Sequence, residues 1–159
     1  MYSLTGDEYI EKAVKTYSKS MLNAAYSLLG SVVDAEDAVQ DAFLKYIQKA
    51  PDFKDADHEK AWLLRVTINI SKNMLKAKGR KNLLIYEDIP YEQNNDEVLQ
   101  CVMSLEEKYR TIIHLYYYED YSIKEIASIL SLPPLIAQRY FPRSFLQNGC
   151  RKVLLYTYL

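Results

Sequence analysis

Polar side chains suited to binding nucleic acid are concentrated between Ala61 and Tyr86. This stretch carries arginine, lysine and asparagine and contains no acid. Five of these side chains form what we call the basic row, which spans about a third of a helix circumference: Arg65, Asn69, Lys72, Asn73 and Lys76. Three further cations follow along the chain, namely Lys78, Arg80 and Lys81. Cations contact phosphates and asparagine amides hydrogen-bond base edges, so this pattern predicts a nucleic-acid-binding face.

A second group of side chains is suited to binding a protein. The residues after Asp34 predict an amphipathic helix with an apolar inner stripe and a polar outer stripe. The outer stripe, called the docking stripe below, comprises Asp37, Gln40, Asp41 and Leu44. A leucine among acids is typical of a surface that docks on a basic partner with one apolar pocket. The alternative is a solvated helix face with an isolated leucine.

The stretch 104–134 has the pattern of a helix-turn-helix. Two S-x-x-E capping boxes, Ser104 with Glu107 and Ser122 with Glu125, predict two helix starts. The second predicted helix is short, carries an inward-facing alanine and ends at a proline-containing turn. Helix pairs of this kind commonly hold a third helix in the major groove of DNA. An ordinary helical hairpin within an all-α core is the alternative.

The elements that position these side chains are all predicted to be helices. The first domain is predicted to contain helices over Asp7–Gly30, from Asp34, and from about Asp57 to Lys78. The predicted division of the chain is a first domain over 1–80, a linker over 81–96 and a second domain over 97–159. The predicted fold class is therefore all-α, with two small helical domains joined by an acidic linker and a helix-turn-helix in the second.

Catalysis is not expected of this chain. It has no glycine-rich phosphate loop, and His58 and His114 lack cysteine or paired-carboxylate partners at metal-ligand spacing. Cys101 and Cys150 are isolated, so neither a disulfide framework nor a metal site nor a cofactor is predicted. No apolar run approaches the roughly 20 residues of a membrane span, and the amino terminus lacks the layout of a signal peptide. We therefore expect a cytoplasmic protein without membrane insertion.

The charges of the chain are segregated although its formal net charge is only −1. Acids without any base occupy the stretch 87–107, whereas only basic charges remain after Glu125. Phosphate binding is mostly electrostatic, so a nearly neutral chain should bind DNA weakly by itself. The distribution predicts a protein that reaches DNA together with a larger partner.

The order of these motifs resembles the extracytoplasmic-function (ECF) sigma factors of bacterial RNA polymerase. The likeness extends from about Tyr9 to Leu132 and is carried by DAEDAVQDAFLKYI, KAWLLRVTINISKNMLK and SLEEKYRTIIHLYYYEDYSIKEIASIL. The resemblance implies a first domain that docks on the polymerase clamp helices and captures the promoter minus-ten element. It implies a second domain that reads the minus-thirty-five element and touches the polymerase flap. The implied partners are core RNA polymerase, promoter DNA and an anti-sigma factor.

The resemblance also assigns roles to individual residues. It assigns the docking stripe to polymerase, and the basic row with the three cations after it to minus-ten DNA. The loop Pro51–Glu59 corresponds to the one that takes a flipped base in relatives. The positions matched to minus-thirty-five DNA are Ser122, Lys124, Gln138, Arg139 and Arg143.

After Leu132 the chain departs from the family pattern. A basic recognition helix is expected there, whereas the chain continues as PPLIAQRYFPRSFLQNGCRKVLLYTYL. Pro142 removes a helical donor, so a helix starting near Pro134 is predicted to end at about Phe141. One hypothesis is a frame change or degeneration of the gene at this end. The alternative is a tail that packs on the second domain.

Three functions are consistent with these patterns. The first is a transcription initiation factor that directs core RNA polymerase to promoters. The second is a sigma-like protein that binds polymerase or an anti-sigma factor but has impaired promoter recognition. The third is a stand-alone helix-turn-helix regulator, which would leave the docking stripe unexplained.

Overall fold

The computed structural model describes residues 6–49, 51–79 and 105–146, and over these ranges the chain is helical with short connections. Its contacts divide it into two compact units, Met1–Ile85 and Tyr86–Leu159. The predicted all-α class is confirmed. The predicted linker lies outside the described residues. Within the described ranges, no helix combines the length and apolarity needed to cross a bilayer.

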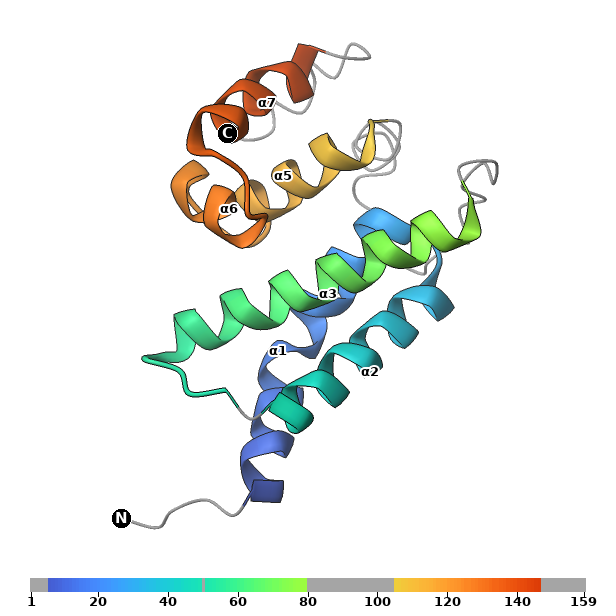
Figure 1. Ribbon diagram of the computed structural model, residues 1–159, viewed down its shortest axis with the longest axis vertical. Coiled ribbons are helices and arrows are strands. Elements are labelled where there is room, and N and C mark those ends of the chain that lie inside the picture. The colour runs from blue at the N-terminus through green and yellow to red at the C-terminus, as the bar shows by residue number, and fades with distance from the viewer. Residues whose placement is uncertain (1–5, 50, 80–104, 147–159) are drawn as a thin grey trace. The chain divides into compact units, whose positions relative to one another are not determined.

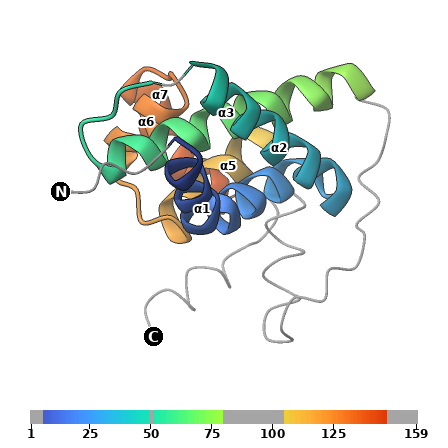
Figure 2. The same cartoon turned by 90° about the horizontal axis from the view of Figure 1, so that it is seen from below.

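The described part of the first unit, residues 6–79 without residue 50, contains three helices that pack against one another: α1 (Gly6–Leu29), α2 (Val32–Lys49) and α3 (Ala56–Lys78). They lie side by side in two perpendicular views (Figures 1 and 2). Each contributes one apolar stripe to a shared core, in which the largest fully buried side chains are Met21, Leu28, Leu63, Leu64 and Ile68. Burial of such stripes is what holds helices of this length together. The core leaves the outer faces of α2 and α3 available for binding.

The starts of α2 and α3 are set by local hydrogen bonds. The prediction that α2 begins at Asp34 is wrong, because the helix begins at Val32. The Ser31 carbonyl accepts from the Ala35 N–H at 3.0 Å, and the Ser31 hydroxyl accepts from the Asp34 N–H at 3.3 Å. Ser31 therefore caps the helix, and Asp34 lies in its first turn. For α3 the cap is Asp55, which accepts from the His58 N–H at 2.7 Å.

In the described range 105–146, the second unit contains α5 (Glu107–Tyr117), α6 (Ile123–Ile129) and α7 (Pro134–Leu146). Its core joins Leu105, Tyr109 and Ile113 with the half-buried Tyr117 and Tyr140. The predicted capping box at Ser122 and Glu125 is confirmed, with both reciprocal hydrogen bonds present. The other predicted box is wrong in position, because α5 is capped by Glu106 without a side-chain hydrogen bond. Ser104 itself lies outside the described residues.

A tight turn connects α6 to α7, as the sequence predicts. Ser131 has a positive φ of 53°, and the Leu132 N–H reaches back to the Ala127 carbonyl at 2.8 Å. This arrangement is a common end of a right-handed α-helix, in which the residue after the helix takes left-handed backbone angles. Ala127 is only 2% exposed, as expected for a small residue at a close helix contact. The turn positions α7 so that it packs against both α5 and α6.

The prediction that the third helix ends near Phe141 is wrong. α7 continues through Pro142 to Leu146. A proline inside a helix removes one backbone hydrogen bond and crowds the preceding turn. The other residues of the helix can still form their backbone hydrogen bonds. In addition, the part of α7 before the proline is held in place by Ala137, which is fully buried. Residues 147–159 lie outside the described residues, so the hypotheses about the tail stay untested.

Candidate functional site

The docking stripe forms a continuous exposed surface on α2. Asp37, Gln40, Asp41 and Leu44 are all exposed, and the Leu44 side chain retains 53% of its accessible surface. Ile47 lies one turn further along this stripe and is 48% exposed. Sequence reasoning missed Ile47, although its spacing of three residues from Leu44 was the signal that could have found it. The stripe thus presents acids at one end and two apolar side chains at the other.

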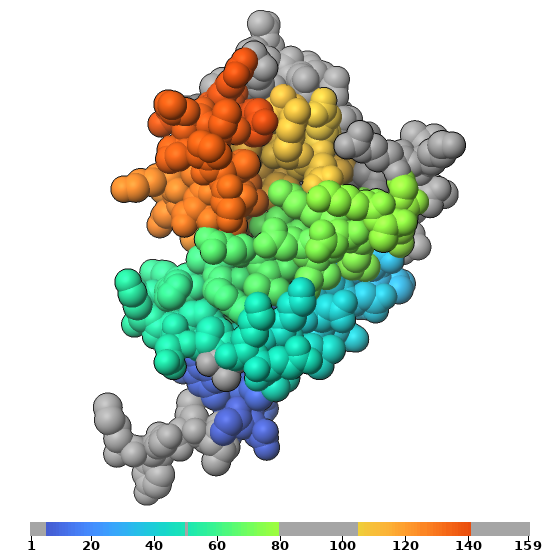
Figure 3. Space-filling view, in the orientation of Figure 1, coloured from blue at the N-terminus to red at the C-terminus, as the bar shows by residue number. Residues whose placement is uncertain are grey.

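An open groove of about 460 Å³ runs beside this stripe between α2 and α3. The α2 side of the groove is formed by Asp41, Leu44, Lys45 and Gln48, and the α3 side by Ile70, Asn73, Met74 and Ala77. The surfaces of these two helices lie next to each other in the space-filling view (Figure 3). Asn73 was predicted to lie with the basic row, yet it also lines this groove. Both apolar and polar side chains line the groove, which suits one large side chain of a partner.

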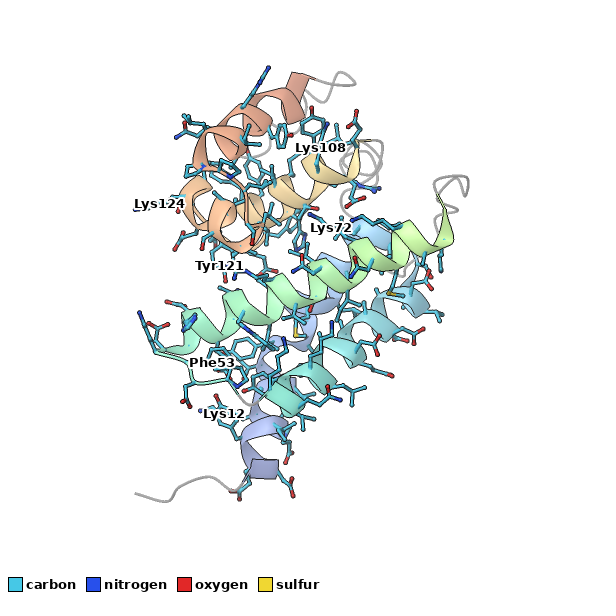
Figure 4. The ribbon with its side chains drawn as sticks, viewed as in Figure 1. Lys12, Phe53, Lys72, Lys108, Tyr121 and Lys124 are labelled. Atoms are coloured by element: carbon cyan, nitrogen blue, oxygen red, sulfur yellow. The ribbon has the colours of Figure 1, made fainter. Side chains whose placement is uncertain are left out.

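The basic row lies along α3 with graded exposure. Asn69, Asn73 and Lys76 are exposed, whereas Arg65 and Lys72 are half-buried. The Lys72 side chain is labelled in Figure 4. Half-buried cations keep their charged ends near the surface while their stems pack on neighbouring atoms. The row therefore offers cations and amides along one helix, as predicted.

The three cations predicted to extend the basic row differ from it in their contacts or in lying outside the described residues. Lys78 is exposed and forms an ion pair with Asp34 of α2. This contact ties the end of α3 to the start of α2, so part of the Lys78 charge is neutralised within the protein. Arg80 and Lys81 lie outside the described residues. Of these three cations, the structure therefore describes Lys78 alone, and Lys78 already has a partner within the protein.

The loop before α3 is anchored by a feature that the sequence analysis missed. The Glu59 carboxylate accepts hydrogen bonds from the hydroxyls of Tyr9 at 2.8 Å, Tyr17 at 3.0 Å and Tyr46. We call these four residues the Glu59 cage. Burial, then the hydrogen bond to Glu59, raises the pKa of Tyr17 to about 12. The same two causes raise the pKa of Tyr46 above its ordinary value.

The start of α6 is already occupied by its own capping box. The Glu125 carboxylate accepts from the Ser122 hydroxyl at 2.6 Å and from the Ser122 N–H at 2.8 Å. These two bonds, the hydroxyl first, lower the pKa of Glu125. Ser122 is therefore engaged within the protein, and a carboxylate stands where a phosphate was expected to bind. Lys124 is exposed and extends away from α6 (Figure 4).

The outer face of α7 carries the predicted base-reading residues. Gln138 and Arg139 are exposed, and Leu135 beside them is 78% exposed. The inner face is fixed by Ala137 and by Tyr140, whose ring meets the Tyr109 ring edge-on at 5.7 Å. Arg143 belongs to α7, but its side chain lies outside the described part of the chain. Gln138 and Arg139 thus lie together on the face opposite the core.

Both histidines contact other groups of the protein. His114 is buried, its Nε2 lies 3.5 Å from Glu119 Oε1, and its ring stacks on Tyr118. His58 Nδ1 accepts from the Lys54 N–H at 3.3 Å. Among the described residues, no three histidine, cysteine or acidic side chains gather at metal-binding distance.

Comparison with known proteins identifies both units. Residues 13–81 match the family described as Sigma-70 region 2, and residues 95–134 match the family described as Sigma-70, region 4. The ECF RNA polymerase sigma factor SigW of Bacillus subtilis is 26% identical over 142 residues, covering 76% of each chain. The ECF RNA polymerase sigma factor SigE of Mycolicibacterium smegmatis is 26% identical over 151 residues, and the match spans 83% of this chain but 58% of that protein.

A solved structure has the same fold. It is that of the sigma factor RpoE in complex with the anti-sigma factor NepR from Bartonella quintana, with a TM-score of 0.70 and 19% identity. The match covers 86% of this chain and 91% of that one. Two sigma-70 regions in the correct order, several ECF relatives and a shared fold agree. The chain belongs to the ECF subfamily of the sigma-70 family.

Proposed function

We propose that this protein is a transcription initiation factor that binds core RNA polymerase and directs it to specific promoters. One observation carries the proposal: a region 2 unit with an exposed acidic stripe and a region 4 unit with a helix-turn-helix occur in that order in one chain. Sigma factors are initiation factors and not enzymes, which is consistent with the expectation from the sequence. A cytoplasmic location follows from this role, because its partners are cytoplasmic.

The docking stripe is proposed to bind the polymerase clamp helices. Its carboxylates, Asp37 and Asp41, would face basic side chains, and Leu44 would enter an apolar pocket. The groove beside Asp41 and Leu44 supports this assignment, because it gives a partner side chain a place to enter between α2 and α3. An anti-sigma factor is proposed to compete for the first unit, in keeping with the complex named for the structural relative.

Minus-ten DNA is proposed to contact α3 and the loop before it. Arg65, Lys72 and Lys76 supply phosphate contacts, and the amide of Asn69 supplies hydrogen bonds to exposed base edges. Asn73 lies between this face and the docking groove and is assigned to both. Lys78, Arg80 and Lys81, which follow the basic row along the chain, are proposed to add phosphate contacts to minus-ten DNA. The expected loop Pro51–Glu59 is shorter in the structure, because α3 begins at Ala56. The loop 51–55 is proposed to receive an unpaired base.

Minus-thirty-five DNA is proposed to contact the second unit. Gln138 and Arg139 would face bases or phosphates from α7, and Lys124 would contact phosphate from α6. The assignment of Ser122 is revised to a structural cap of α6. Arg143 continues the predicted face, and the flap of polymerase is the proposed protein neighbour. The domain division at 1–80, 81–96 and 97–159 remains part of this proposal.

Binding measurements distinguish an initiation factor from the two alternatives, a stand-alone regulator and a sigma-like protein with impaired promoter recognition. The experiment compares binding of the protein to core polymerase alone, to promoter DNA alone, and to both together. An initiation factor binds core tightly and binds promoter DNA specifically only in the presence of core. Specific DNA binding without core would favour the stand-alone regulator. Core binding without any promoter complex would favour the sigma-like protein with impaired promoter recognition.

A further inference from the structure

The Glu59 cage joins all three helices of the first unit at one carboxylate. Tyr9 and Tyr17 come from α1, Tyr46 comes from α2, and Glu59 lies in the first turns of α3. The Tyr17 hydroxyl also lies 3.3 Å from the Ala56 carbonyl at the start of α3. Hydrogen bonds to a charged acceptor are stronger than neutral ones. The position of the α3 start relative to α1 and α2 is therefore fixed at this point.

Tyr46 connects the cage to an aromatic stack. Its buried ring lies parallel to the Tyr9 ring at 6.1 Å and parallel to the Phe53 ring at 6.0 Å. Trp62 of α3 contacts both Tyr46 at 6.1 Å and Phe53 at 5.8 Å. Because the Tyr46 hydroxyl is held by Glu59, the ring is fixed at both its edge and its faces. The orientation of Phe53 follows from that of Tyr46.

Phe53 belongs to the loop between α2 and α3 and directs its ring toward the helices (Figure 4). The loop is held at two further points, by the Asp55 cap and by the Lys54 N–H bonded to His58 Nδ1. The His58 ring also meets the Phe53 ring edge-on at 5.4 Å. Phe53 and Trp62 remain half-buried, and Lys54 beside them is exposed. Exposed aromatic surface next to a cation is the arrangement on which an unpaired base stacks.

We infer that Glu59 is a positioning residue for this loop: through the Tyr46 hydroxyl and the Tyr46–Phe53 stack, it sets the aromatic surface on which an unpaired promoter base is received. This inference rests on the proposed function. Glu59 itself is not expected to touch DNA, because its carboxylate is directed at three hydroxyls. Its substitution should therefore affect promoter opening and leave docking on core polymerase unchanged.

The test uses the full chain assembled with core polymerase on a promoter carrying 2-aminopurine at successive minus-ten positions. Glu59→Leu removes both acceptor oxygens and with them all three hydrogen bonds, and we expect it to reduce the opening signal by about tenfold, a loss typical of a charged hydrogen bond. Tyr46→Phe keeps every ring and removes one hydroxyl, and it should reduce opening in the same direction. Glu59→Gln keeps one acceptor oxygen and should recover most of the signal. The matched control is Glu11→Leu, an exposed acid on α1.

Two additional readouts make each outcome decisive. Affinity for core reports whether the first unit is folded, and fluorescence of Trp62, the single tryptophan of the chain, reports the aromatic stack. Reduced opening and altered Trp62 fluorescence at unchanged core affinity support the inference. Wild-type opening by Glu59→Leu or Tyr46→Phe overturns it while leaving the proposed function intact. Failure of the wild-type protein to open any promoter overturns both, and loss of core affinity in both Glu59→Leu and Tyr46→Phe assigns the cage to stability alone.

Discussion

Asp41 of α2 and Asn73 of α3 line the same groove of the first unit. The surface proposed for polymerase and the surface proposed for minus-ten DNA therefore adjoin along one pair of helices. A substitution of Asn73, which is assigned to both surfaces, would affect both activities. The predictions below therefore leave Asn73 unchanged and substitute residues that are assigned to one surface only.

The docking stripe is tested by combining Asp41→Lys with Leu44→Ala. Both side chains are exposed, so the fold should be retained while charge complementarity and the apolar anchor are lost. We expect affinity for core polymerase to fall by about a hundredfold or more, as for truncation of interface hot spots. The measurement is fluorescence anisotropy with labelled protein. The control pair Glu11→Lys with Val14→Ala has the same spacing on an exposed part of α1, and equal affinity of both pairs would refute the assignment.

The basic row is tested by combining Lys72→Glu with Lys76→Glu. Reversal of two charges should prevent opening of promoter DNA, because phosphate binding depends on local positive potential. Core affinity should stay within about twofold of wild type, since neither lysine lines the groove beside the docking stripe and solvent-screened charges contribute little to binding. Permanganate reactivity of unpaired thymines measures opening. Lys12→Glu with Lys19→Glu, on exposed positions of α1, is the control, and normal reactivity in the row variant would exclude α3 as the DNA face.

The capping box of α6 predicts a stability effect in the second unit. Ser122→Ala removes the hydroxyl that accepts from the Glu125 N–H at 3.3 Å and donates to the Glu125 carboxylate at 2.6 Å. Loss of such a cap should lower the free energy of unfolding by about 1 kcal/mol. Urea denaturation of the full chain measures the change, and Ser122→Thr should preserve most of the stability. An unchanged midpoint for Ser122→Ala would show that the cap is not needed for α6.

The Glu59 cage predicts a pH dependence at alkaline pH. The pKa of Tyr17 is raised from 10.0 to about 12 by burial and by its hydrogen bond to Glu59. Because the folded-state pKa exceeds the unfolded one, the stabilising contribution is complete below pH 10 and is lost as the pH rises toward 12. The difference in melting temperature between wild type and Tyr17→Phe should therefore be largest below this window and shrink across it. A difference that stays constant with pH would contradict the cage.

Much of this organisation could be predicted from the sequence, because it depends on local patterns. Amphipathic spacing predicts α1, α3 and the exposed stripe of α2, and the S-x-x-E pattern predicts the cap at Ser122. Two errors have local causes. The acidic pattern predicts that α2 begins at Asp34, whereas Ser31 supplies the capping hydroxyl three residues earlier. Pro142 predicts a helix end near Phe141, whereas α7 continues through the proline to Leu146.

The Glu59 cage could not be predicted because its members lie on three helices. Tyr9 and Tyr17 have helical spacing, and this spacing is typical of core residues whatever their hydroxyls contact. Only the packing of α1 and α2 against the start of α3 brings the hydroxyls to one carboxylate. The dual position of Asn73 has the same origin, since the groove exists only when α2 and α3 are paired.

The most direct test of the central claim is run-off transcription from a promoter library with core polymerase and this protein. We predict transcripts with discrete start sites from a subset of templates that share minus-ten and minus-thirty-five sequences. These transcripts should disappear with the Asp41→Lys and Leu44→Ala pair and persist with the Glu11→Lys and Val14→Ala pair. Tight binding to core without any specific transcript would contradict the account and indicate a protein that sequesters polymerase.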